Sequence, residues 1–383
     1  MRKLKTPTAR NILNIIGKKI ITLMNRHIFF APLKNNRGVA LLVTVGIITI
    51  MIAAGMQINQ KMTLAATRAA TIRDRLNAYE MAVSGVHGAM ALLLKDKKET
   101  TADSLQEEWA DPEYLKSMVE EFGFENGGLE IIISDELSKI QINALVQFPE
   151  GRNFDETQLA FWERFANRMM LLYEEVEDTD AVTIIHTVKD WLDSGDDDAI
   201  TGLSGAESDY YEGLDPPYAC KNGPFTHLGE VVLVKGITPE IFYGFGEILG
   251  FSNYITIHGM SETEEKKLTY PGKININTAP LPVVAALLPS DSEGFAQALI
   301  DYREDKSDEK FVNELTDEKW YKNIPGFGSI DISPGLIQVS SDVFRIRSTA
   351  TVNDVKLTIK AVVQREKNEK NEKWQCKVLN WQA

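Results

Sequence analysis

The stretch that decides the fold is Val39–Met56, VALLVTVGIITIMIAAGM, which lies within a segment from Gly38 to Gln60 without any charged residue. About 20 apolar residues at 1.5 Å each cross a bilayer core, so residues 39–60 are predicted to form one membrane span. A secretory signal peptide is the alternative, but its apolar core is typically about 7–15 residues and ends in a small-x-small cleavage motif. No clear motif of that kind closes this run.

Charge is distributed unevenly along the 383 residues. Residues 1–38 contain nine lysines and arginines and no acid, whereas the whole chain carries a net charge of -14. The positive-inside rule therefore places the N-terminus in the cytoplasm and exports the acidic body. Such a body disfavours sequence-independent binding of nucleic acid, which depends on basic side chains. A hydrophobic content of 44% and a charged content of 25% argue against disorder and against a multi-span transporter.

The helix predicted for the span continues beyond it. No proline occurs from residue 57 to residue 94, and no glycine occurs in that range before Gly85. Apolar and small residues recur close to the 3.6-residue helical period from Met62 to Met90. One helix from about Val39 to Leu94 is expected, with half of it in lipid and half in water.

The body beyond residue 95 shows strand and helix signals in turn. The predicted elements are strands at 129–134 and 139–146, a helix at 155–177, a hairpin of strands at 343–351 and 356–363, and a last strand at 375–381. Strands on both sides of a helical middle indicate an α+β domain, in which a sheet packs on the long helix and an inserted helical domain interrupts it.

The start of the span resembles a known processing site. Arg37-Gly38 followed by Val39-Ala40-Leu41-Leu42 resembles a type IV prepilin site, where a peptidase cuts after the glycine and the new N-terminus is methylated. The usual pattern has glutamate at the fifth mature position, which here is Val43. The K-type minor pseudopilin of the type II secretion system, general secretion pathway protein K (GspK), commonly lacks that acid. Five ordered blocks are similar to the same family: SDELSKIQINALV (134–146), VKDWLDSGDDD with GAESDYY (188–211), PPYACKNGPF (216–225), HLGEVVLVKGITPEIF (227–242) and KININTAPLPVVAALLP (273–289).

The resemblance implies a fold and a set of boundaries. It implies an α+β, pilin-like fold whose long N-terminal helix packs on an antiparallel sheet, interrupted by an inserted α-helical domain of the SAM or helix-hairpin-helix kind. The expected divisions are a cleaved leader (1–38), the transmembrane part (39–60) and periplasmic part (61–95) of the first helix, the two sheet halves (96–150 and 326–383), and the insert with an acidic metal loop (151–325).

The resemblance also implies a function. The chain would be a single-pass protein of a Gram-negative inner membrane, with its N-terminus in the cytoplasm and its body in the periplasm. It would lie at the tip of the pseudopilus, form a complex with the I-type and J-type minor pseudopilins, and start assembly for protein export. The major pseudopilin and the prepilin peptidase are further expected partners. Neither nucleic acid nor a small-molecule substrate is expected.

Acidic residues gather in one loop, at 190–198 and 207–209. Carboxylates around glycine turns suit Ca²⁺, which takes about six to eight oxygen ligands. From the residues alone, a solvated acidic loop without an ion is an equally good interpretation. The spacing is not that of an EF-hand. The resemblance to the K-type pseudopilin implies a structural calcium ion in this loop. The favoured ligands are Asp193, Asp196, Glu207 and Asp209, with Asp190, Asp197 and Asp198 as weaker candidates.

Asn275-Ile276-Asn277-Thr278-Ala279 before a helix resembles the opening of helix-hairpin-helix modules, which hold DNA phosphates. A pilin-like DNA-uptake or adhesion protein is therefore the alternative function. The segment 273–289 has one basic residue, Lys273, which opposes DNA binding.

We predict no enzyme, because no catalytic motif is present and the histidines are scattered along the chain, at 27, 87, 186, 227 and 258. Trp109, Trp162, Trp191 and Trp320 are expected in the core or at interfaces. Cys220 and Cys376 are too few for a disulfide framework, and the sequence leaves open whether they pair or stay free.

Overall fold

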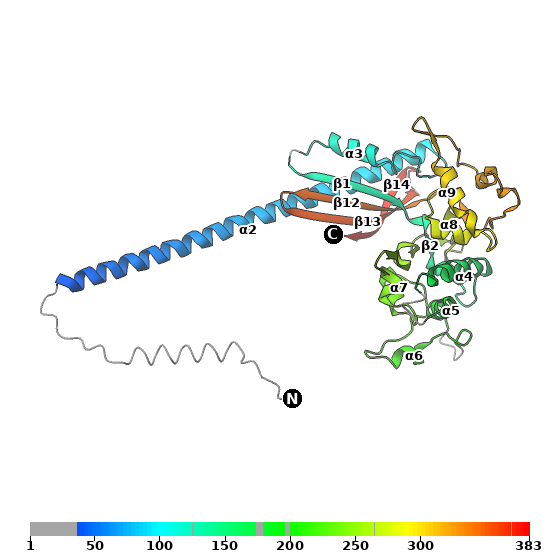
Figure 1. Cartoon of the computed structure of the whole chain (residues 1–383), viewed down its shortest axis with the longest axis horizontal. Helices are drawn as coiled ribbons and strands as arrows, with labels where there is room; N and C mark the ends of the chain where they lie inside the picture. The colour runs from blue at the N-terminus through cyan, green and yellow to red at the C-terminus, as the bar shows by residue number, and fades with distance from the viewer. Residues whose placement is uncertain (1–36, 125, 174–178, 196–199, 264, 369) are drawn as a thin grey trace. The chain divides into compact units, whose positions relative to one another are not determined.

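A computed structural model describes residues 37–124, 126–173, 179–195, 200–263, 265–368 and 370–383. The chain divides into two units, residues 1–70 and 71–383. Helix α2 (Arg37–Glu99) begins in the first unit and continues into the second (Figure 1). The long helix predicted from the sequence is therefore confirmed, although it extends a few residues further at each end. Of the predicted leader, only Arg37 and Gly38 lie within the described residues.

The two parts of α2 differ in composition. α2 contains a stretch of 18 residues with a mean hydropathy of 2.5, so it is long and apolar enough to cross a membrane. In the second unit, small and apolar side chains are buried at helical spacing, from Ala78 through Ala82, Val86 and Ala89 to Leu93.

The main sheet has four antiparallel strands in the order β1-β12-β13-β14 (Figure 1). The strands are β1 (Gly128–Asp135), β12 (Val343–Val352), β13 (Val355–Lys367) and β14 (Trp374–Gln382). The hairpin and the last strand predicted from the sequence are confirmed. β1 lies beside β12 although a long stretch of chain separates them, because the insert leaves the sheet after β1 and returns at β12.

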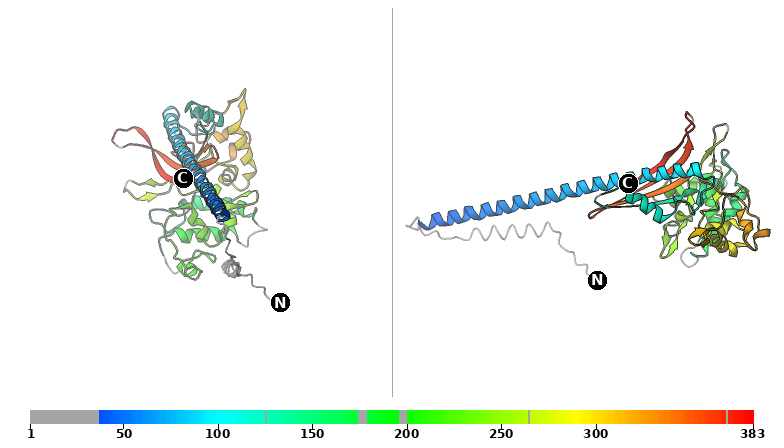
Figure 2. Two further views of the ribbon diagram at one scale, coloured as in Figure 1. Left: turned by 90° about the vertical axis from the view of Figure 1, so that its left-hand side faces the viewer. Right: turned by 90° about the horizontal axis from the view of Figure 1, so that it is seen from above.

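One face of the sheet packs against α2 and helix α3 (Pro112–Glu121), as Figure 2 shows from two further sides. Alternate side chains such as Phe344, Ile346 and Ile359 form this first core together with Trp109. Gly85 of α2 permits the close approach, because a Cβ there would lie 2.3 Å from Ser348 Oγ.

The predicted strand at 139–146 is wrong. In place of one strand, the two-residue β2 (Ile140–Gln141) pairs in parallel with β5 (Ile255–Thr256), and the 3₁₀ helix η2 (Ile142–Leu145) follows. The side chain of Asn143 provides the reason. It donates to Phe225 O at 3.1 Å and accepts from Phe225 N at 2.8 Å, so this segment contacts a loop of the insert in place of a sheet neighbour.

The insert comprises residues 136–342, between β1 and β12, and is built mainly from short helices around a second core. Its helices are α4 (Glu156–Met170), α5 (Ala181–Leu192), α6 (Ser208–Glu212), α7 (Pro239–Tyr243), α8 (Leu281–Leu287) and α9 (Ala296–Glu304). Its 3₁₀ helices, with η1 before η2, are η1 (Glu136–Ser138), η3 (Leu228–Leu233), η4 (Phe251–Asn253), η5 (Glu293–Phe295), η6 (Trp320–Asn323) and η7 (Phe327–Ser329). Two-residue strands complete it: β3 (Gly244–Phe245), β4 (Ile248–Leu249), β6 (Ser261–Glu262), β7 (Leu268–Thr269), β8 (Ile274–Asn275), β9 (Lys306–Ser307), β10 (Lys310–Phe311) and β11 (Ile337–Gln338).

The predicted helix at 155–177 exists, but α4 ends at Met170. Asp155 caps its N-terminus by accepting from Thr157 N and Gln158 N, both at 3.0 Å. The four tryptophans expected in cores are buried, three of them in the insert. Aromatic and apolar burial thus gives the insert a core separate from that of the sheet.

Candidate functional site

The predicted metal residues Asp190, Asp193 and Glu207 come together in the insert. Asp190 lies in the last turn of α5, Asp193 directly follows that helix, and Glu207 precedes α6. Each offers a carboxylate oxygen within 4.8 Å of the other two. All three are buried, with exposed fractions of 0%, 7% and 8%. We call these three residues the acidic centre.

Asp190 holds the loop that closes the acidic centre. Its two carboxylate oxygens accept from Thr201 N at 3.1 Å each, and Oδ2 also accepts from Ala206 N at 2.8 Å. Burial raises the pKa of Asp190, although the bonds from Thr201 act to lower it. Gly205 is required here, since a Cβ would lie 2.1 Å from Asp190 Oδ2. The polypeptide is therefore shaped closely around this carboxylate.

The ammonium group of Lys189 lies beside two of the three carboxylates. Lys189 Nζ lies 2.6 Å from Asp193 Oδ2 and 4.0 Å from Asp190 Oδ1. Two like charges about 4 Å apart repel by about 4 kcal/mol at an effective dielectric near 20, so an excess of carboxylates is costly. The oxygen donors and the negative charge both fit a hard divalent cation such as Ca²⁺.

Of the remaining predicted ligands, Asp209 lies in the described part of the chain and does not join the cluster. Asp209 is exposed on α6 and is not part of the group of converging oxygens. Asp196, Asp197 and Asp198 lie outside the described residues. Asp190, a weaker candidate from the sequence, is therefore central, whereas the favoured Asp209 is peripheral.

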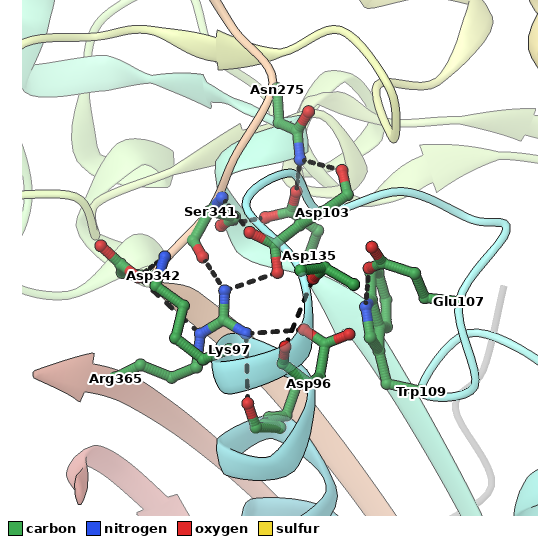
Figure 3. A network of polar contacts seen from close by, with 12 residues as sticks. Asp96, Lys97, Asp103, Glu107, Trp109, Asp135, Asn275, Ser341, Asp342 and Arg365 are labelled. Atoms are coloured by element: carbon green, nitrogen blue, oxygen red, sulfur yellow. Dashed lines mark hydrogen bonds and ion pairs between the residues drawn. The ribbon is translucent and has the colours of Figure 1, made fainter. Parts of the chain in front are cut away.

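A second cluster of carboxylates lies where α2, the sheet and the insert meet, and sequence reasoning missed it. Its centre is Arg365 of β13, which is fully buried (Figure 3). Arg365 Nη1 donates to Asp96 Oδ2 at 2.9 Å and to Leu93 O at 3.2 Å, and Nη2 donates to Asp103 and to Ser341 O. One guanidinium thus binds the end of α2, the following connection and the entry to β12.

Asp135 at the end of β1 extends this network toward the insert. Its Oδ1 accepts from Ser341 Oγ at 2.6 Å, and its Oδ2 accepts from Asn275 Nδ2 at 2.8 Å and from Thr278 Oγ1 at 2.6 Å. Burial raises the pKa of Asp135 to about 6, although these hydrogen bonds act to lower it. We call Arg365 and the carboxylates of Asp96, Asp103, Glu107 and Asp135 the junction network.

The two asparagines of the helix-hairpin-helix resemblance belong to the same region. Asn275 donates to Asp103 O at 2.9 Å, Asn277 donates to Leu315 O at 3.1 Å, and Trp320 Nε1 donates to Asn277 Oδ1 at 2.7 Å. Neither asparagine is exposed. Because their side chains are used up inside the fold, this segment packs the insert and does not present these groups to a DNA phosphate.

The cysteines and histidines do not form a site in the described part of the chain. Cys220 and Cys376 are free thiols. Cys220 belongs to the insert core and Cys376 packs against the sheet core, so the disulfide left open by the sequence is not formed. His227 Nδ1 accepts from Gly229 N at 3.0 Å and caps η3, while His186 Nδ1 lies 3.2 Å from Ser204 Oγ.

Comparisons with known proteins agree with this architecture. Two family models, both described as type II secretion system protein K, match residues 138–244 and 274–319. Type II secretion system protein K of Aeromonas hydrophila is 27% identical over 87% of this chain and 94% of its own length. The protein of the same description from Pseudomonas aeruginosa is 25% identical over 88% of this chain and 91% of its own length.

A solved structure supports the fold. A chain of the GspK-GspI-GspJ complex from the type II secretion system of enterotoxigenic Escherichia coli superposes with a TM-score of 0.53 at 18% sequence identity. The match covers 82% of this chain and 98% of that chain.

The long apolar helix, the antiparallel sheet packed on it and the large insert define a pilin-like protein that carries a helix suited to a membrane anchor. Together with the matched families and relatives, this places the chain in the type II secretion system protein K family, and it is a minor pseudopilin of that system.

Proposed function

We propose that this minor pseudopilin lies at the tip of the pseudopilus and starts its assembly. The observation that carries the proposal is the insert: residues 136–342 separate two neighbouring strands of the sheet and form their own core. A domain of this size would clash inside a packed fibre but fits at its end. To test the position at the tip, an affinity tag on the insert is labelled in isolated pseudopili and located by electron microscopy. Label along the fibre shaft would contradict it.

The N-terminus supports the same position. We propose that prepilin peptidase cuts after Gly38 and that Val39 is then N-methylated. Val43 takes the place where the usual pilin pattern has glutamate, a carboxylate suited to neutralise the N-terminal amine of a neighbouring subunit. An outermost subunit has no such neighbour above it. Mass spectrometry of the purified protein is expected to find N-methylated Val39, and an intact Met1 would exclude this processing.

We propose that the protein spans the inner membrane once, with the basic N-terminus in the cytoplasm and the acidic body in the periplasm. The nine basic residues before the apolar segment support this orientation. Protease added to spheroplasts is expected to digest the body. Full protection of the body from protease until the membrane is lysed would contradict this orientation.

The expected partners are the I-type and J-type minor pseudopilins, and the major pseudopilin follows them in the fibre. In the second unit, Ile72, Leu76 and Tyr79 of α2 are exposed apolar residues at helical spacing. Ile72→Asp with Leu76→Asp is expected to reduce co-purification of the I and J types at least tenfold. Asn77→Asp, an exposed change on the same helix, is the matched control.

We propose that the acidic centre binds one structural Ca²⁺ through Asp193 and Glu207, with Asp190 supplying oxygen ligands while it orders the loop. Calorimetric titration of the full chain in detergent micelles is expected to detect one calcium site. Asp193→Asn with Glu207→Gln is expected to remove it, whereas Asp209→Asn retains it because Asp209 lies outside the cluster. Loss of the site with Asp209→Asn alone would point to a different ligand set.

A further inference from the structure

The sheet has a second face, opposite α2, whose character differs from the rest of the chain. Because Phe344 and Ile346 of β12 and Ile359 and Ala361 of β13 pack into the core with α2, the alternate residues of these strands point the other way. Four of those alternate residues are basic, and we call this surface the basic face: Arg345, Arg347, Lys356 and Lys360. Such a patch is unexpected on a chain with a net charge of -14.

Two of these cations lie directly opposite each other. Arg347 and Lys360 are cross-strand partners in the antiparallel pair of β12 and β13, and both are exposed. Within the described residues, no hydrogen bond or ion pair joins either side chain to an acid. Like charges directly opposite on neighbouring strands destabilise a sheet. The arrangement therefore costs stability in the free protein unless an anion lies over it.

A pocket opens at one end of the basic face, between the sheet and the insert. It has a volume of about 320 Å³. Basic and amide side chains from three strands of the sheet line it beside apolar groups, including Arg345, Lys360, Val362, Asn380, Gln382 and Phe242. These amides and the ammonium group can donate hydrogen bonds to an entering carboxylate.

The acid in the pocket is already neutralised. Glu136 accepts from Arg345 Nε at 2.8 Å and from Arg345 Nη2 at 2.6 Å, and Lys139 Nζ lies 3.5 Å from it. Although burial acts to raise it, Lys139 and Arg345 hold the pKa of Glu136 down at about 2. Lys360 has no such partner in the described chain, so it is the cation left for a ligand.

We propose that the basic face and its pocket bind an acidic segment of a partner polypeptide, with one carboxylate of that segment entering the pocket to meet Lys360. This interaction surface goes beyond the proposed position at the fibre tip. A polypeptide is favoured over nucleic acid because apolar groups lie beside the cations. Ile132 of β1, 37% exposed, is the other neighbour of Arg347 on this face, and Val362 and Phe242 line the pocket. Acidic and apolar side chains alternating along one extended segment would satisfy both.

The test uses the full chain in detergent micelles and a fluorescent peptide of alternating glutamate and valine, with binding followed by fluorescence anisotropy. Binding is expected at low salt and is expected to weaken as salt is added. Arg347→Glu with Lys360→Glu is expected to weaken it at least tenfold. The matched control is Lys116→Glu with Lys319→Glu, which changes the net charge equally at exposed sites elsewhere and is expected to leave binding unchanged.

A second measurement separates binding from folding. Lys360→Glu alone places opposite charges across the strand pair, so this variant is expected to melt at a higher temperature than the parent while binding the peptide more weakly. Equal binding by the parent and both double variants, or no binding by the parent, would overturn the proposal. Stronger binding of an oligonucleotide of the same charge, dependent on Arg347 and Lys360, would also overturn it by assigning the surface to nucleic acid.

Discussion

The acidic centre and the junction network each gather three carboxylates with oxygens within 4.8 Å of one another, but their cations hold these groups differently. In the junction network these are Asp96, Asp103 and Glu107, and the fully buried Arg365 binds the two aspartates. In the acidic centre the cation is the ammonium group of Lys189, which binds mainly Asp193.

The difference between the two cations is chemical. A guanidinium is planar, always charged and able to donate to several acceptors at once, whereas an ammonium is a point charge on a flexible stem. Arg365 also bonds two backbone carbonyls, so its two Nη groups together donate to four acceptors. The guanidinium of the junction network therefore holds two carboxylates and two carbonyls together inside the chain. In the acidic centre Lys189 holds mainly one carboxylate, and an external cation can bind the oxygens that converge there.

The largest loss of stability is expected when Arg365, the cation of the junction network, is replaced. Arg365→Met leaves Asp96 and Asp103 buried without their partner, and breaking a buried ion pair in this way costs about 3–5 kcal/mol. Urea unfolding of the full chain in detergent micelles measures the change. Arg347→Met, an exposed arginine on the same sheet, is the control and is expected to change stability by under about 0.5 kcal/mol. Similar losses in both variants would mean that Arg365 contributes no more than a surface residue.

The second largest effect is expected on the melting temperature when calcium is removed from the acidic centre. Calcium at about 100 times its dissociation constant stabilises a protein by about 2.7 kcal/mol, so chelation is expected to lower the melting temperature of the chain. This decrease is expected to disappear in Asp193→Asn with Glu207→Gln and to persist in Asp209→Asn. An equal melting temperature with and without chelator would show that no bound cation stabilises the acidic centre. It would contradict the difference proposed between the two clusters.

A smaller effect tests how closely the loop fits Asp190. Gly205→Ala forces a Cβ against Asp190 Oδ2 and Thr201 N, at 2.1 and 2.7 Å, and overpacking of this kind costs about 1–3 kcal/mol. The same variant is expected to weaken calcium binding, because the carboxylate must move. Gly294→Ala, with nothing within 4 Å of its Cβ, is the control. A stable Gly205→Ala variant with unchanged calcium affinity would show that the loop adapts freely.

The sequence predicted the elements that local patterns determine. The apolar run, the hairpin and the helical spacing each follow from residues near one another in the chain, and all three elements are present. The strand at 139–146 was wrong because Asn143 bonds the backbone of Phe225, a contact that only the folded chain creates. Nearby apolar and β-branched residues carry no sign of such a partner.

The candidate site shows the same limit. The density of acids points to Asp190, Asp193 and Glu207, but the match to the family motif favours the exposed Asp209 over the buried Asp190. The junction network was missed because its acids come from segments far apart in the chain. One signal was available: Ile359, Ala361 and Val363 alternate on the buried face of β13, and the same alternation puts Arg365 inside. A buried arginine requires acids nearby.

The smallest expected effect is a change of stability with pH, which distinguishes the junction network from the acidic centre. Burial raises the pKa of Glu107 to about 7, and it raises that of Asp135 to about 6, in both cases above the value of the unfolded chain. The folded state therefore binds these protons more tightly, so stability is expected to increase as pH falls from 8 through 7 and 6. The gain is complete once the pH is below the unfolded values near 4. Glu136, whose pKa is held at about 2, acts in the opposite direction, since its stabilisation is lost below about pH 4.

Glu107→Gln keeps the size of the side chain and an oxygen that can accept from Trp109 Nε1 and Ser104 N, the bonds that Glu107 accepts at 2.7 and 3.1 Å. It removes a titrating group, so the rise in melting temperature between pH 8 and pH 6 is expected to shrink by about 1–2 °C. Glu108→Gln is the control, because hydrogen bonding from Lys95 lowers the pKa of Glu108 and its titration lies below this range. Melting with calcium held constant isolates the junction network. If Glu107→Gln leaves the slope unchanged while Asp193→Asn removes it, the proton-sensitive cluster is the acidic centre, and the contrast drawn between the two clusters is wrong.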